Sequence, residues 1–132
     1  MSERQKAVRA ADKAFSEYIR KRDGYTCYTC GHVGQPSDGV MQVGHLITRA
    51  KYSVRWDEDN AACQCRSCNM RHEYQPEIFT DKYIRDKGIE AYHDLVFTSN
   101  KPRKWTTQEI REIARYYKDA AGRLEGDIYG ES

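Results

Sequence analysis

The sequence predicts a mainly helical α+β domain built around a small hairpin that a metal ion holds together. Three observations lead to this fold class. Apolar residues recur at helical spacing near both ends of the chain, a short central segment alternates loosely, and two Cys-x-x-Cys pairs flank that segment. With 132 residues, 39% hydrophobic and 32% charged, the chain fits one domain, residues 1–132, whose modest core suits a metal staple.

The N-terminal segment, residues 3–23, is expected to form a basic amphipathic helix. Phe15 and Ile19 fall on its apolar face, charged residues fall on the other, and Gly24 follows as a C-cap. The predicted core of the domain, residues 24–75, begins directly after this helix.

Within the core, residues 40–47 are expected to form a strand with His45 near its end. Residues 48–59 are then interpreted as a connecting loop. A short helix is expected over about 67–74, ended by Pro76.

The C-terminal region, residues 77–121, is predicted to be helical. Its clearest signal is the capping box formed by Thr106 and Glu109, which marks a helix start. The tail, residues 122–132, is expected to be frayed. The three helices are expected over residues 77–87, 89–97 and 107–121.

Paired Cys-x-x-Cys motifs supply four thiolates, the ligand set of a closed, structural zinc site. Cys27 and Cys30 form the first pair, and Cys65 and Cys68 form the second. Cys63 is left over and is interpreted as a small buried thiol. A thiol redox protein is a poorer explanation, because the chain lacks the βαβ pattern around such a motif.

Two basic flanks surround a more neutral centre. Residues 1–22 and 101–123 each hold seven Lys or Arg against three Asp or Glu, which suits a polyanionic partner or two solvated helix faces. No apolar stretch is long enough to span a membrane, and the N-terminus reads as the mature start of a cytosolic protein.

The residue types between and after the cysteines could support phosphodiester hydrolysis. His45 could act as a general base, while Asn69, His72 and Glu73 would share one helix face and could hold a hard divalent cation. Each residue alone has an ordinary structural explanation, as a satisfied histidine, a cap or a surface side chain. Their fixed order between two metal-binding pairs favours the functional explanation.

The order of these motifs along the chain resembles that of HNH (His-Me finger) endonucleases with a four-cysteine zinc site. The resemblance is closest to the phage NinG/Rap recombination nucleases and more distant to phage endonuclease VII. The resemblance covers about residues 10–75. It rests on Cys27-x-x-Cys30, Gly44-His45, Arg55-Trp56-Asp57-x-x-Asn60 and Gln64-Cys65-x-x-Cys68-Asn69.

The resemblance implies a ββα-metal element with a role for each matching residue. His45 would activate water, Asn60 would hold the base or its loop, and Asn69 would bind catalytic Mg²⁺ or Mn²⁺. Many relatives carry a metal-binding Asp at the position of Gly44. Glu73 is the first candidate replacement, and His72 is the second.

The resemblance also implies a branched DNA substrate of the Holliday-junction or D-loop type, a homodimer, and action in the cytoplasm of a bacterial host if a phage encodes the chain. Tyr52 or Trp56 could stack on an unpaired base, although a core position is preferred for Trp56. The alternative is a non-catalytic zinc-ribbon module that binds DNA, which Gly44 favours. The expected phosphate contacts are Arg49, Lys51, Arg55 and Arg71.

Overall fold

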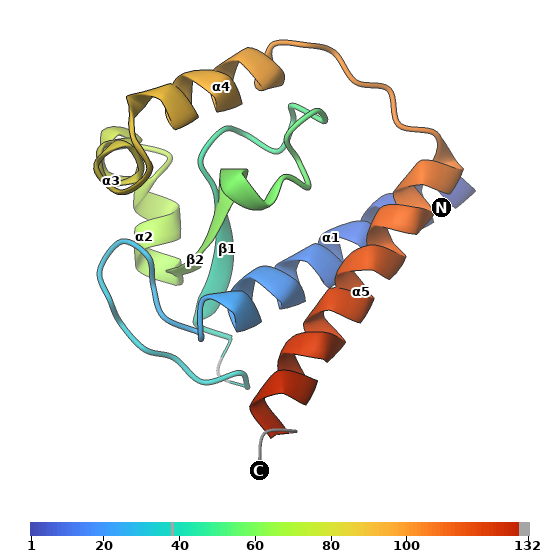
Figure 1. Ribbon diagram of the computed structural model, residues 1–132, viewed down its shortest axis with the longest axis horizontal. Helices are drawn as coiled ribbons and strands as arrows, with labels where there is room; N and C mark the ends of the chain where they lie inside the picture. Colours follow the sequence, from blue (N-terminus) through green and yellow to red (C-terminus); the bar gives the residue numbers. More distant parts are fainter. Residues whose placement is uncertain (38, 130–132) are drawn as a thin grey trace.

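The computed structural model describes residues 1–37 and 39–129, with the side chains of 125–129 outside the description. It shows a mixed, mainly helical architecture with one two-stranded sheet, as the sequence predicts (Figure 1). The elements are α1 (Glu3–Arg22), β1 (Met41–His45), the 3-10 turn η1 (Glu58–Asn60), β2 (Ala61–Cys65), α2 (Arg66–Arg71), α3 (Glu77–Lys87), α4 (Ile89–Ser99) and α5 (Thr107–Tyr129).

Local signals at both ends explain the bounds of α1. Ser2 and Gln5 form a reciprocal capping box at its start. At its end, Gly24 adopts a φ of +61°, and the N–H groups of Gly24 and Tyr25 bond back to carbonyls of the last helical turn. The helix expected over residues 3–23 is therefore confirmed to within one residue.

The sheet consists of β1 antiparallel to β2, with His45 opposite Ala61 and Gly44 opposite Ala62. Cross-strand partners share a face. Val43 and Ala61 therefore lie on the face that packs against α1, whereas Ala62 faces α3 and α4. Among the described residues β1 has no second neighbouring strand, so its outer edge is open.

Helices from the two ends of the chain pack side by side and cover one face of the hairpin (Figure 1). Phe15 of α1 meets Tyr117 of α5 edge to face, with ring centroids 4.9 Å apart. The Tyr117 hydroxyl donates to the Trp56 carbonyl across 2.8 Å, which ties α5 to the loop before β2. The other face of the hairpin packs on α3 and α4 through Phe79 and Leu95.

Two predicted helix ends are wrong. The helix expected over 107–121 continues to Tyr129, although residues 122–132 were expected to fray; residues 130–132 lie outside the described residues. An exposed glycine such as Gly122 costs a helix only about 1 kcal/mol, which is too little to end it. The short helix expected to reach residue 74 ends at Arg71 and is followed by a turn.

No helix within the described part of the chain combines the length and the apolar character needed to cross a bilayer.

Candidate metal centre and adjoining cleft

Four cysteine side chains converge beside the hairpin. The Sγ atoms of Cys27, Cys30, Cys65 and Cys68 all lie within 4.8 Å of one another. The Sγ atoms of Cys30 and Cys65 are 3.8 Å apart, and a tetrahedron with Zn–S bonds of about 2.3 Å has edges of about 3.8 Å. The four cysteines are therefore close enough to bind a metal such as zinc.

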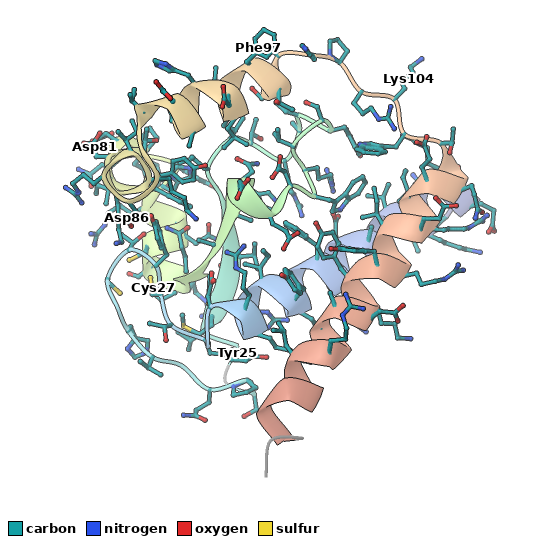
Figure 2. All side chains as sticks on the ribbon, in the orientation of Figure 1. Tyr25, Cys27, Asp81, Asp86, Phe97 and Lys104 are labelled. Carbon is teal, nitrogen blue, oxygen red and sulfur yellow. The ribbon has the colours of Figure 1, made fainter. Side chains whose placement is uncertain are left out.

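Backbone N–H groups are aimed at these sulfurs, which suits thiolates. The N–H of Cys30 lies 3.5 Å from Cys27 Sγ, and the N–H of Cys68 lies 3.5 Å from Cys65 Sγ at the start of α2. Burial raises the pKa of Cys27, but backbone hydrogen bonds outweigh it and lower that pKa to about 7. Yellow sulfur atoms gather around the Cys27 loop in Figure 2.

Cys63 is a buried thiol outside this cluster, as expected. Its side chain is fully buried, and burial raises its pKa to about 12. It therefore stays protonated and acts as a small apolar core residue.

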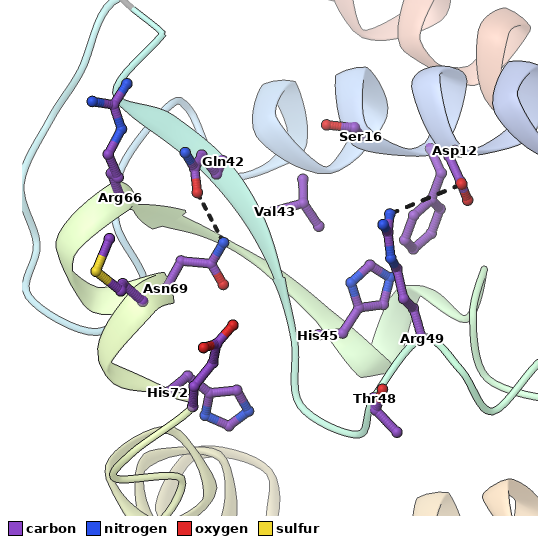
Figure 3. A pocket seen from close by; sticks show the side chains of 13 residues that line it. Asp12, Ser16, Gln42, Val43, His45, Thr48, Arg49, Arg66, Asn69 and His72 are labelled. Atoms are coloured by element: carbon purple, nitrogen blue, oxygen red, sulfur yellow. Dashed lines mark hydrogen bonds and ion pairs between the residues drawn. The ribbon is translucent and has the colours of Figure 1, made fainter.

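A cleft of about 840 Å³ opens along the free edge of β1 (Figure 3). His45 and Arg49 lie on one side of the strand, and Asn69 and His72 lie on the other. The cleft therefore gathers side chains from α1, β1 and α2 on a single open edge. Its lining residues include Asp12, Gln42, His45, Arg49, Asn69 and Glu73.

The His45 ring is oriented by a main-chain carbonyl. Its Nε2 lies 3.0 Å from the Arg55 oxygen. Because a carbonyl only accepts, this contact places the proton on Nε2 and leaves the lone pair on Nδ1. Burial lowers the pKa of His45 below its ordinary value of 6.5. The imidazole is therefore neutral near pH 7, as a general base must be.

Asp12 supports this arrangement and was not anticipated from the sequence. Its carboxylate accepts two hydrogen bonds from the Arg55 guanidinium, at 3.0 and 2.7 Å, and one from the Trp56 indole at 2.9 Å. The residue whose carbonyl holds His45 is thus anchored to α1. Asp12 and Arg55 are 43 positions apart, so no local pattern links them.

Asn60 fixes the loop that returns from β1. The side chain is fully buried, and its carboxamide exchanges hydrogen bonds with the main chain of Ile47 at 2.8 and 2.9 Å. It also donates to the Val54 carbonyl at 3.1 Å. These bonds hold both ends of the segment 47–54, which leads to Arg55.

On the opposite side of the cleft, the Asn69 amide donates to Gln42 Oε1 across 2.9 Å. The remaining side-chain oxygen of Asn69 is an acceptor. Glu73 is exposed and lines the same cleft. His72 is held differently, because its Nε2 lies 3.2 Å from the Leu46 carbonyl and its ring packs on Phe79. Its Nδ1 is buried and has no hydrogen-bond partner among the described residues.

The basic residues expected to contact phosphate are not equivalent. Arg49 is 63% exposed at the cleft, 3.9 Å from Asp12, and Lys51 is exposed on the adjoining loop. The guanidinium of Arg55 is occupied by Asp12 with only 12% of its side chain exposed. Arg71 is exposed and lines a neighbouring groove instead of the cleft. Arg66, which the sequence analysis did not single out, lines both.

Neither aromatic residue suggested for base stacking is presented at the cleft. Trp56 is only 6% exposed, which confirms the preferred core position. Tyr52 is half-buried, lies under the Arg55 guanidinium and accepts a hydrogen bond from the Trp105 indole through its carbonyl.

Comparison with known proteins places this arrangement in a family. The model of the bacteriophage lambda NinG protein matches residues 1–126. The chain belongs to the NinG family. Relatives with the name protein ninG include that of Salmonella phage P22, 29% identical over 113 residues, and that of Enterobacteria phage H19B, 28% identical over 107 residues. These matches cover 84% and 80% of this chain.

The NinG chain spans about half the length of these relatives, 54% and 52% respectively. A protein of Lactococcus phage SK1 named probable HNH endonuclease is 26% identical over 84 residues, covering 60% of this chain and 79% of its own. No solved structure matches the chain.

Proposed function

We propose that this NinG-family chain is a metal-dependent HNH (His-Me finger) DNA endonuclease that cuts branched recombination intermediates. The observation that carries the proposal is the cleft, in which His45 and Asn69 face one open strand edge from opposite sides. The four-cysteine cluster beside it joins the loop before β1 to the start of α2. The likeness to a probable HNH endonuclease supports the same class.

The donor set fits a catalytic divalent ion, Mg²⁺ or Mn²⁺. Asn69 and Glu73 offer oxygen atoms at the same cleft, and oxygen ligands are what these hard cations prefer. When bound, such an ion supplies Lewis-acid stabilisation of the charge that develops on the phosphate and the leaving oxygen.

The protein groups have separate tasks in this mechanism. His45 removes a proton from the attacking water through Nδ1, while the bond from Nε2–H to the Arg55 carbonyl keeps the ring in the required tautomer. Asn60 keeps the loop behind it in place. Arg49 neutralises and positions the phosphate at the rim.

The four cysteines would bind zinc with no open coordination position, so this ion would serve structure alone. It would hold the loop that carries Cys27 and Cys30 against the start of α2, and thereby set the distance between Asn69 and β1.

Branched DNA, a homodimer and action in the cytoplasm of a bacterial host complete the proposal. Arg49, Lys51, Arg66 and Arg71 are exposed on or near the cleft and would contact the sugar-phosphate backbone without reading sequence. Two-fold cleavage of a four-way junction requires two sites, which a homodimer provides. Light scattering at several concentrations measures the oligomeric state.

The test is a cleavage panel of four-way junction, D-loop, flap, duplex and single strand with Mg²⁺ or Mn²⁺. We expect the chain to cut branched DNA preferentially and His45→Ala to lose about 10²–10⁴-fold in rate. His93→Ala, which alters an exposed histidine on α4, is the matched control and should retain full activity. Equal cleavage of all five substrates would remove the branched-DNA assignment.

A second candidate is a zinc-stabilised module that binds DNA without cutting it. It is favoured by Gly44, which offers no side chain to bind a metal ion. This function predicts that His45→Ala and wild type bind a four-way junction equally and that neither cleaves it with any divalent ion.

A further inference from the structure

The side chain of Gln64 is fully buried yet only half satisfied. Gln64 lies on β2 with 1% of its surface exposed. Its Nε2 donates to Thr29 Oγ1 across 2.7 Å, in the loop between the first two cysteines. Its Oε1 has no hydrogen-bond partner among the residues that the structure describes. A buried acceptor without a partner costs about 1–3 kcal/mol, so this oxygen calls for an explanation.

That oxygen is directed at the place where residue 44 has no side chain. A Cβ added to Gly44 would lie 1.8 Å from Gln64 Oε1 and 2.7 Å from Gln64 Cδ. The Gln64 carboxamide therefore fills the space that any side chain at position 44 would need. A carboxylate at position 44 and the present position of Gln64 exclude each other.

A second side-chain oxygen reaches the same place from α2. Asn69 Oδ1 lies 3.2 Å from the position of that added Cβ. The Asn69 amide donates to Gln42, which fixes the carboxamide so that its oxygen is the end turned toward Gly44. Two amide carbonyl oxygens, from β2 and α2, thus converge on the space above the buried backbone of Gly44. Asn69 also lines the cleft, whereas Gln64 lines a small neighbouring pocket that it shares with His72.

We propose that Gln64 Oε1 is a ligand of the catalytic divalent cation, together with Asn69 Oδ1, and replaces the carboxylate that Gly44 lacks. This assignment rests on the proposed function. Amide carbonyl oxygens are regular ligands of hard cations. Because both are neutral, Glu73 is left to supply the protein's negative charge from the rim. Thr29 serves as a positioning residue that holds the Gln64 amide from behind.

The test measures Mn²⁺ binding by electron paramagnetic resonance on the full-length, zinc-loaded protein without DNA. Gln64→Met keeps the volume but removes the oxygen, and we expect it to weaken Mn²⁺ binding by about tenfold or more. Gln64→Glu adds a charge at the same position and should tighten it. Gln108→Met, the same substitution at an exposed glutamine on α5, is the matched control and should leave the Mn²⁺ affinity unchanged.

Equal Mn²⁺ affinity in wild type and Gln64→Met would overturn the assignment, as would weaker or unchanged binding in Gln64→Glu. A loss in Gln108→Met as large as that in Gln64→Met would show that the effect is not specific to the Gln64 oxygen and would overturn the assignment as well. Zinc content and circular dichroism establish that each variant is folded. The binding assay contains no DNA, so it is independent of cleavage. If Mn²⁺ binding depends on Gln64 but the chain cuts none of the five substrates, the nuclease proposal is refuted and the ligand assignment stands.

Discussion

His45 gives the protein a pH dependence whose direction follows from its burial. Burial disfavours the imidazolium in the folded state and lowers the pKa of His45 below 6.5. The unfolded chain therefore takes up the proton more readily as pH falls through 6.5, and the free energy of unfolding decreases. Above that pH both states are neutral at this residue and it contributes no pH dependence.

We expect urea denaturation to show a lower free energy of unfolding at about pH 5 than at about pH 7.5. The drop should be smaller in His45→Gln, in which this group cannot titrate while the other groups are unchanged. An equal drop in both proteins would assign the acid sensitivity to other residues.

Asp12 is expected to matter for both stability and activity. Asp12→Ala removes three hydrogen bonds and leaves the Arg55 charge without its partner. The pair is partly exposed, so we expect a loss of about 2 kcal/mol in the free energy of unfolding, measured with urea. Cleavage should fall as well, because the Arg55 carbonyl orients His45. Asp119→Ala, on the exposed side of α5, is the control and should change neither quantity.

At the scale of residues, spacing alone predicted the four-cysteine cluster and placed His45 near the end of a strand. Both signals are local and chemically specific. Asp12 and Gln64 could not be found in this way. Asp12 acts through a residue 43 positions away, and Gln64 acts through an oxygen whose direction depends on the pairing of β1 with β2. Such roles appear only once the strands and helices are assembled.

Replacing either of two glycines by alanine is expected to change the free energy of unfolding, with opposite signs because the two glycines lie in different elements. Gly44 lies in β1 under the Gln64 carboxamide, so Gly44→Ala should lower the free energy of unfolding by about 1–3 kcal/mol through overpacking. Gly122 lies within α5 with nothing within 4 Å of an added Cβ. Gly122→Ala should therefore raise the free energy of unfolding by about 0.5–1 kcal/mol, because alanine has the higher helix propensity.

Thermal melts of the two glycine variants and the wild type test both predictions: the melting temperature should fall in Gly44→Ala and rise in Gly122→Ala. A stabilised Gly44→Ala would mean that Gln64 moves aside without cost.

Helix boundaries were predictable where a side chain caps the end. The Thr106 hydroxyl accepts from the Glu109 N–H at 3.0 Å, and the Glu109 carboxylate accepts from the Thr106 N–H at 2.9 Å, so the start of α5 was placed correctly. Its end was misplaced at 121, because an exposed glycine such as Gly122 costs a helix only about 1 kcal/mol and does not end it. A glycine inside a helix and a glycine that ends one look alike in a short window of sequence.

For the whole molecule, removal of the zinc ion proposed at the four cysteines should be more disruptive than the loss of any single contact. The cysteines join the loop before β1 to the end of β2 and the start of α2, in a domain of modest size. We expect a strong chelator, or Cys68→Ser, to lower the melting temperature markedly and to abolish cleavage together with structure. Circular dichroism with and without added zinc measures this. Full activity in zinc-free, folded protein would contradict the structural role of the cluster.

The pairing of α1 with α5 has a consequence for the newly made chain. Arg4 donates to the carbonyl of Trp105, which is 101 positions away in the sequence. Phe15 contacts the His45 ring as well as Tyr117. During translation, the hairpin and both cysteine pairs leave the ribosome well before α5 does. The packing behind His45, in which Phe15 contacts Tyr117, is therefore incomplete until α5 has been made, since contacts of long sequence separation form late. The proposed DNA-cutting site is therefore complete only after α5 has been synthesised and has packed on α1.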